Sequence, residues 1–186
     1  MGGNESTDLS DLVEAMKRAT EVLRAAGIPF AVCGGLAVYA RGGTPTNHDV
    51  DLLIRETDAG PALTALADAG FRTERPPLNW LVKAYDGDVL IDLIFRPVDR
   101  PVTDGTLADT EELSLGAARV PVLSATELLI HGLRTLTAQE CDLAAPLLLA
   151  RAIREQIDID RVRAETKDSP YAQAFLFLAE QLEVIP

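Results

Sequence analysis

Two acidic residues at the start of an apolar segment constrain this chain more than any other feature. Residues 50–54 read Val-Asp-Leu-Leu-Ile, which is typical of a buried strand, and Asp49 and Asp51 lie at its start. Side chains two apart in a strand point to the same face, so the two carboxylates are expected to lie together. Adjacent carboxylates repel each other unless a cation lies between them, and oxygen-only ligands favour Mg²⁺ or Mn²⁺. The pattern therefore predicts a metal site at the start of this strand.

Two glycines that precede the predicted metal site in the sequence suggest that a phosphate group would face the metal. Residues 30–33 are apolar and predict a strand, and Gly34-Gly35 predicts a turn that opens a short helix. Glycines let the backbone approach a ligand closely, and the free N–H groups at a helix start favour phosphate. We expect Gly34 and Gly35 to bind the phosphates of a nucleotide, although a glycine pair alone more often marks a tight turn.

A third acidic residue lies inside a later apolar run. Asp92 is surrounded by the apolar residues of segment 89–95, where an ionised side chain needs a partner or a cation. Asp86-Gly87 between the apolar runs 80–85 and 88–95 predicts a β-hairpin. If the second strand of this hairpin lies beside strand 50–54, Asp92 meets the other two carboxylates. This convergence is a hypothesis, because the register of two strands cannot be read from the sequence.

The order of these features resembles the DNA polymerase beta-like nucleotidyltransferase superfamily. The chain has Gly34-Gly35, then thirteen residues, then Asp49-Val50-Asp51, then Asp92 on a later strand, and the resemblance covers about residues 28–97. It implies an α/β (α+β) nucleotidyltransferase fold, a small mixed β-sheet flanked by helices with a helical C-terminal part. It also implies catalytic and metal-binding roles for Asp49, Asp51 and Asp92, with Mg²⁺ or Mn²⁺ as cofactor and a nucleoside triphosphate (NTP) as substrate.

The Gly-Gly form resembles two branches of the superfamily, the AbiE-type toxins and the small aminoglycoside and lincosamide nucleotidyltransferases. Many other members have Gly-Ser, so a phosphate-binding hydroxyl is missing at Gly35. The antibiotic branch usually shows Thr-Arg-x-His-x-Asp-x-Asp, whereas here the arginine is absent and His48, which we expect to be an ordinary loop residue, directly precedes the first aspartate. The toxin branch usually has a triphosphate-binding lysine one turn after a segment that resembles residues 122–129. Here His131 or Arg134 replaces that lysine, or both are solvated helix positions.

The sequence is compatible with three functions. The first is an AbiE-like component of a toxin–antitoxin pair, with tRNA or a protein as acceptor and an antitoxin as possible partner. The second is an antibiotic nucleotidyltransferase with a small cationic acceptor, which the net charge of −12 mildly favours because an acidic protein repels nucleic acid. The third is a catalytically inactive module that keeps the fold to bind a protein. Magnesium-dependent nucleotide binding would separate the enzymes from the module.

The rest of the chain predicts mostly helices, and we divide it into a catalytic core (1–116) and a helical C-terminal region (117–186). The segment 96–116 is polar and is expected to be an irregular connection, and Arg41 is expected to be a surface charge at a helix end. Ser124 and Glu127 predict a capping box at the start of a helix. Further helices are expected over 9–26, 61–69 capped by Thr57, 124–137, 140–156 with an apolar face of Leu143, Leu147, Leu148 and Ile153, and 169–182; short strands are expected over 71–74 and 120–123.

Other patterns exclude several classes of protein. The two cysteines, Cys33 and Cys141, form no CxxC motif, so neither a disulfide framework nor a thiolate metal site is indicated. No apolar stretch approaches the length of a membrane span, and the polar start of the chain lacks the core of a signal peptide. We therefore expect a cytoplasmic protein without a membrane partner.

Overall fold

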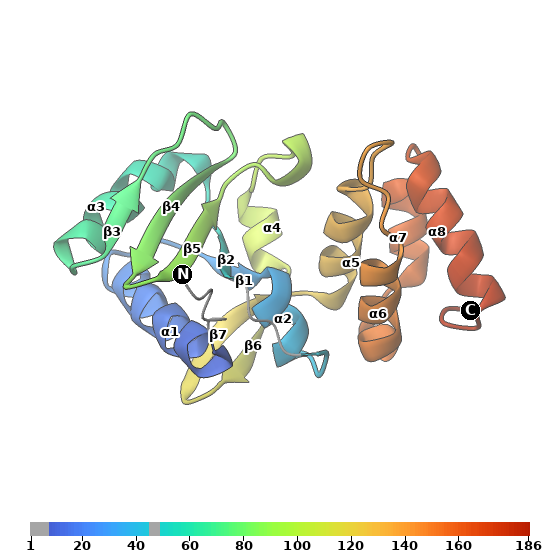
Figure 1. Cartoon of the computed structure of the whole chain (residues 1–186), viewed down its shortest axis with the longest axis horizontal. Helices are drawn as coiled ribbons and strands as arrows, with labels where there is room; N and C mark the ends of the chain where they lie inside the picture. The colour runs from blue at the N-terminus through green and yellow to red at the C-terminus, as the bar shows by residue number, and fades with distance from the viewer. Residues whose placement is uncertain (1–7, 45–48) are drawn as a thin grey trace, which may run out of the picture.

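The computed structural model describes residues 8–44 and 49–186, and a seven-stranded mixed sheet forms its centre (Figure 1). The order of the strands is β3-β4-β5-β2-β1-β7-β6. This architecture confirms the predicted mixed α/β fold. The strands are β1 (Ala31–Cys33), β2 (Val50–Leu53), β3 (Arg72–Glu74), β4 (Leu81–Asp86), β5 (Val89–Ile94), β6 (Thr110–Leu115) and β7 (Ala118–Leu123).

The helices cover the sheet and extend beyond one side of it (Figure 1). Their bounds are α1 (Leu9–Ala25), α2 (Gly34–Ala40), α3 (Ala59–Asp68), α4 (Asp104–Ala108), α5 (Ala125–Arg134), α6 (Ala144–Ile153), α7 (Ile159–Thr166) and α8 (Pro170–Gln181). Short 3₁₀ helices occur at Glu56–Asp58, Pro97–Asp99 and Arg154–Gln156. Within the described residues, no helix combines the length and the apolar character that crossing a bilayer requires.

Packing in the hydrophobic core fixes the direction in which the side chains of strand β2 point. Helix α1 carries buried residues at helical spacing, among them Leu12, Met16 and Leu23, and it contacts β2 and β5. Val50 and Leu52 of β2 are fully buried, so they fill one face of the sheet and leave the alternate residue on the other face. The apolar alternation that predicted strand β2 therefore also decides that Asp51 faces away from α1.

Helix α5 joins two hydrophobic cores. One contains buried residues from Leu12 to Leu128, and the other contains buried residues from Leu129 to Ile185. Strand β7 pairs with β1 and extends the sheet to Leu123, so a boundary at residue 116 would divide the β6–β7 hairpin. We therefore propose Ser124 as the division between the sheet and the helical region.

The segment expected to be an irregular connection was wrongly predicted. Residues 96–116 form a 3₁₀ helix, helix α4 and strand β6, which pairs with β7 around a turn at Gly116 with φ of +58°. Strand β6 is at the edge of the sheet, and exposed Glu111 and Glu112 replace the apolar alternation that marks a half-buried strand. Only Leu113 and Leu115 alternate as apolar residues, at the end of the strand, and this pattern is too short to predict the whole strand.

Three smaller helix predictions also need correction. Thr57 lies inside the 3₁₀ helix that precedes α3, so it does not cap α3. Helix α6 begins at Ala144 rather than near residue 140, and Leu148, expected on its buried face, is 60% exposed. The Ser124 hydroxyl does accept a hydrogen bond from the Glu127 backbone, but the Glu127 carboxylate binds Arg161 of α7 instead of completing a capping box.

Arg41 is buried, contrary to the expectation of a surface charge. Its side chain is 1% exposed, and its Nε donates to the carbonyl of Leu123 at 2.8 Å. Its other nitrogens donate to the carbonyl of Val122 and to the side chains of Glu111 and Gln156. The guanidinium thus connects the end of α2 with the end of β7 and with the 3₁₀ helix after α6.

Arg41→Ala is expected to lower the free energy of unfolding by about 3 kcal/mol, because it leaves buried carbonyl groups without a donor. Urea unfolding followed by circular dichroism measures this loss. The matched control is Arg151→Ala on helix α6, where the arginine is exposed and the expected change is within about 0.5 kcal/mol. Equal effects of the two substitutions would show that the buried contacts of Arg41 do not stabilise the fold.

Candidate active site

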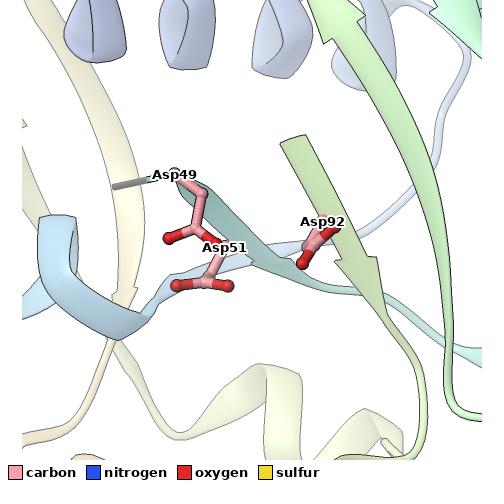
Figure 2. Close-up of side chains that lie close together, drawn as sticks. All are labelled: Asp49, Asp51 and Asp92. Carbon is pink, nitrogen blue, oxygen red and sulfur yellow. The ribbon is translucent and has the colours of Figure 1, made fainter. Parts of the chain in front are cut away.

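Strand register brings the three predicted acidic residues together. Strands β2 and β5 are parallel with Asp51 opposite Asp92, and β1 is antiparallel to β2 with Cys33 opposite Asp51. Asp49 directly precedes β2 and points to the same side as Asp51 (Figure 2). One carboxylate oxygen from each of the three aspartates lies within 4.8 Å of the others. The predicted convergence of the three carboxylates is confirmed.

The three carboxylates repel one another in a partly buried place, and a bound cation would relieve this repulsion. Burial, followed by the charges of Asp49 and Asp92, raises the pKa of Asp51 to about 7. Burial is also the main reason that the pKa of the Cys33 thiol is raised well above its usual value, so the thiol stays neutral and is a poor metal ligand. The donors are therefore carboxylate oxygens alone, which fits a hard divalent cation such as Mg²⁺ or Mn²⁺.

Lys83 is a charged neighbour of the cluster that the sequence analysis missed. It lies opposite Asp92 on β4, and its Nζ donates to Asp92 Oδ1 at 2.9 Å. Although burial lowers the pKa of Lys83, its hydrogen bond with Asp92 and the Asp92 charge raise it above the usual value, so the amine is charged. The sequence did contain the signal. The hairpin turn pairs Asp86 with Val89, and three residues further along each strand are Lys83 and Asp92.

Gly34 is required by the position of Asp51. It opens helix α2 with φ of +60°, a conformation that residues with a side chain rarely adopt. A Cβ atom at Gly34 would lie 1.8 Å from Asp51 Oδ2. We expected a ligand to approach Gly34 closely. In the structure, the group that lies against Gly34 is the Asp51 carboxylate of the acidic cluster.

A cavity of about 710 Å³ opens beside the cluster and reaches helix α5. It brings His131 and Arg134, two expected nucleotide-binding residues, to the same space as Gly34 and Asp51. Gly35 instead lines a neighbouring cavity, and His48 lies outside the described residues. The residues around the first cavity that matter for charge and shape are Gly34, Asp51, Trp80, Arg96, His131 and Arg134.

Arginines, rather than the histidine, supply positive charge to this cavity. Burial, followed by the charges of Arg100 and Arg134, lowers the pKa of His131 to about 4, so its ring is neutral at pH 7. The Nε atoms of Arg96 and Arg134 are buried and have no hydrogen-bond partner among the described residues. Such donors are costly without a ligand. Arg96 was missed, although its place four residues after Asp92 puts it near the same end of strand β5.

The second cavity, of about 900 Å³, lies between α2, α5 and α6. It shares Gly132, Thr135 and Glu140 with the first cavity. Its wall combines apolar side chains, including Leu136 and Leu149, with the carboxylates of Glu140 and Asp142. The two cavities therefore adjoin each other: Arg96 and Arg134 line only the first, Asp142 lines only the second, and Glu140 lines both.

Comparison with solved structures places this fold among nucleotidyltransferases. The crystal structure of ANT(2")-Ia in complex with adenylyl-2"-tobramycin matches with a TM-score of 0.61 and 17% identity, over 88% of this chain and 95% of that one. The lincomycin-bound lincosamide antibiotic adenylyltransferase LnuA matches with a TM-score of 0.51 and 10% identity, over 76% of this chain and 95% of that one. An antigenic nucleotidyltransferase-like protein from Paracoccidioides brasiliensis matches with a TM-score of 0.50 and 18% identity, over 92% of this chain and 89% of that one. At these identities the likeness shows the fold.

The family is established by the sequence. Among curated proteins, none matches the chain. The sequence family described as "Uncharacterised nucleotidyltransferase" matches residues 8–185, which is nearly the whole chain. The superfamily resemblance found in the motifs is thereby confirmed: the chain belongs to this nucleotidyltransferase family.

Proposed function

We propose that the protein transfers a nucleoside monophosphate from an NTP to the hydroxyl group of an acceptor. The observation that carries this proposal is the convergence of Asp49, Asp51 and Asp92 on one face of the sheet, next to a cavity that Arg96 and Arg134 line. These three aspartates would hold Mg²⁺ or Mn²⁺. A bound cation of this kind offsets negative charge on the phosphates and lowers the pKa of a hydroxyl group.

The residues around the cluster have separate tasks in this reaction. The acceptor oxygen attacks the α-phosphorus, a new O–P bond forms, and the bond to the leaving pyrophosphate breaks. Asp92 is placed to accept the proton of the acceptor hydroxyl, because one of its oxygens faces the other two carboxylates. Gly34 leaves room for the Asp51 carboxylate, which lies where a Cβ atom would be, and Gly34 itself lines the cavity. His131, which is neutral, is available only as a hydrogen-bonding group.

Arg96 and Arg134 are proposed to bind the triphosphate. Each has one nitrogen engaged elsewhere, Arg96 with Glu56 at 2.8 Å and Arg134 with the carbonyl of Glu165, so both side chains are held in place. Both side chains also line the cavity, so their positive charge lies next to the space proposed for the triphosphate. Arginine pairs with phosphate through charge-assisted hydrogen bonds, which are about twice as strong as neutral ones.

Arg96→Gln and Arg134→Gln are each expected to raise the Kd for NTP about tenfold, because each removes one charge-assisted contact. Isothermal titration calorimetry in the presence of Mg²⁺ measures the change, and the melting temperature checks the fold. Arg151→Gln, an exposed arginine on α6, is the matched control and is expected to leave the Kd unchanged. An unchanged Kd in both cavity variants would remove these arginines from the NTP site.

For the acceptor, we favour a small cationic molecule. The second cavity presents Glu140 and Asp142 beside apolar walls, and the whole chain has a net charge of −12. Both features attract a cation and repel RNA. Two structural neighbours carry an adenylylated aminoglycoside or a lincosamide, which agrees with this class of acceptor. The role in a toxin–antitoxin pair, which the helical C-terminal region favoured by resemblance, has no support of its own in the comparisons.

The test is transfer of label from α-³²P-NTPs. Each of the four NTPs is incubated with Mg²⁺ and, in turn, an aminoglycoside, a lincosamide, tRNA or a mixture of proteins. Magnesium-dependent labelling of a small cationic acceptor is the expected result. Labelling of tRNA or protein alone would move the acceptor to the toxin-like class. No labelling of any acceptor and no pyrophosphate release would favour the inactive protein-binding module.

A further inference from the structure

The single tryptophan of the chain lies in the wall of the first cavity, and the proposed reaction gives it no task so far. Trp80 directly precedes strand β4 and lines the cavity together with Gly34 and Asp51. We propose that the indole ring of Trp80 is the surface on which the nucleobase of the bound NTP stacks. The inference rests on the proposed function, since it concerns the nucleotide of that reaction.

Trp80 is one of the few large apolar residues that stay accessible among the described residues. It is 38% exposed, whereas Leu81, the next residue of the chain, is 1% exposed. Covering a tryptophan removes a large apolar surface from water, so an exposed one in a cavity wall leaves this gain available to a ligand. Ile94 and Pro97 line the same cavity. A flat, largely apolar group such as a nucleobase suits a wall of this composition.

The backbone holds Trp80 near the strand that carries Asp92. The N–H groups of Phe95 and Arg96 both donate to the Trp80 carbonyl, at 2.9 and 3.1 Å, and so extend the pairing of β4 with β5. Asp92 lies four residues before Arg96, which is about 13 Å along an extended strand. A nucleotide with its α-phosphate at the acidic cluster and its base on Trp80 spans this distance together with the Trp80 side chain.

The charges near Trp80 favour a base over the cationic acceptor. The face of a tryptophan also binds cations, so the acceptor is the competing occupant. The Arg96 backbone contacts Trp80, and Arg96 and Arg134 line the same cavity. These guanidinium groups repel a cation on the indole ring, whereas they leave a neutral base in place and attract its triphosphate. Of the acids outside the cluster, Glu140 lines both cavities, and Asp142 lines only the second, which Trp80 does not line.

The fluorescence of Trp80 tests the inference directly, because the chain has no other tryptophan. The wild type is titrated in Mg²⁺ with each of the four NTPs and, separately, with tripolyphosphate, which has the phosphates but no base. We expect saturable quenching by at least one NTP, with the Kd that calorimetry gives, because a stacked base changes the surroundings of the indole ring. Tripolyphosphate is expected to displace this NTP without quenching the fluorescence to the same extent.

Two substitutions at Trp80 separate stacking from cavity shape. Trp80→Leu is expected to raise the calorimetric Kd for this NTP about tenfold or more, since stacking on an aromatic ring is lost, and to leave the Kd for tripolyphosphate unchanged. Trp80→Phe keeps an aromatic ring and is expected to stay within about threefold of the wild type. Leu78→Ala is the matched control, because Leu78 is also exposed but does not line this cavity, and both Kd values are expected to stay unchanged. Circular dichroism checks that each variant is folded.

The outcomes separate this inference from the proposed function. An NTP that binds without quenching, an unchanged Kd for NTP in Trp80→Leu, or an equal rise for NTP and tripolyphosphate would overturn the role of Trp80 and leave the proposed transferase standing. Quenching by an aminoglycoside but by no NTP would place Trp80 in the acceptor site and would likewise overturn it. A wild type that binds no NTP in calorimetry would contradict the proposed function, and this inference with it.

Discussion

Replacing Asp51 by asparagine is expected to abolish nucleotidyl transfer, by at least about a thousandfold, while leaving the protein folded. The substitution removes one of three oxygen ligands and keeps the shape of the side chain. Asp51 is held between Asp49 and Asp92, so its loss leaves the site with too little negative charge for a divalent ion. The rate of pyrophosphate release with Mg²⁺ measures the effect.

The same substitution is expected to stabilise the metal-free protein at high pH. The pKa of Asp51 is about 7 in the fold, above the value of about 3.9 in an unfolded chain. Ionisation of Asp51 therefore costs stability as the pH rises between these values, and asparagine avoids this cost. In EDTA at pH 8, Asp51→Asn is expected to gain about 1–2 kcal/mol over the wild type, and the gain is expected to vanish near pH 4.

Asp88→Asn provides the matched control for both measurements. Asp88 is an exposed acid at the start of the β5 side of the hairpin and does not belong to the cluster. We expect it to change neither turnover nor the free energy of unfolding. Full turnover in Asp51→Asn would contradict the assignment of Asp51 as a metal ligand.

Gly34→Ala is expected to have the second largest effect, a loss of transfer of about a hundredfold or more together with reduced stability. The new methyl group would meet Asp51 Oδ2 at 1.8 Å, so either Asp51 or the start of α2 has to move. Displacement of a catalytic group by about 1 Å can cost a factor of about a hundred in rate. Turnover and urea unfolding are measured on the same preparation.

Gly87→Ala separates the clash from the backbone strain. Gly87 has φ of +59°, nearly identical to the +60° of Gly34, but nothing lies within 4 Å of its Cβ position. It is therefore expected to lose about 1 kcal/mol of stability and no activity. If Gly34→Ala behaved in the same way, the contact between Gly34 and Asp51 would have no part in the reaction.

The local sequence predicted most of the central sheet and the cluster within it. Strand β2, the Asp86-Gly87 hairpin and helix α1 all have strong apolar periodicity, so tertiary packing agrees with local preference. The convergence of Asp92 with Asp51 required the parallel pairing of β2 and β5, which is a contact between residues 41 positions apart. The residues themselves suggested this pairing only because Asp92 lies alone in an apolar run, where burying its charge without a partner would be costly.

The missed features are those in which a polar residue has a tertiary partner. Arg41 looks like a helix-end charge, and only the carbonyl groups at the end of β7 explain its burial. Arg96 is recognised as a site residue by its place in the cavity wall, and Lys83 by its pairing with Asp92 on the neighbouring strand. Strand β6 is held by its pairing with β7 and has exposed glutamates where apolar residues would have revealed it. Apart from Lys83, whose pairing with Asp92 follows from the position of the hairpin turn, no local pattern encodes contacts of this kind.

The helical region contributes to the site through α5 and its partners. Arg161 of α7 binds both Asp109, just before β6, and the Glu127 carboxylate at the start of α5. These ion pairs connect the start of the edge strand with α7 and with α5, the helix that carries Arg134 in the cavity wall. The position of α5, and with it the position of Arg134 in the cavity wall, thus depends on contacts between the sheet and the helical region.

The central claim is that the acidic cluster and the adjoining cavity form one NTP site. Calorimetric titration of ATP, CTP, GTP and UTP into the wild type, with Mg²⁺ and with EDTA, and then into Asp49→Ala, tests it most directly. We predict that at least one NTP binds, and that binding is lost both in EDTA and in Asp49→Ala. Failure of all four NTPs to bind, or binding that is indifferent to Mg²⁺ and to Asp49, would contradict the account.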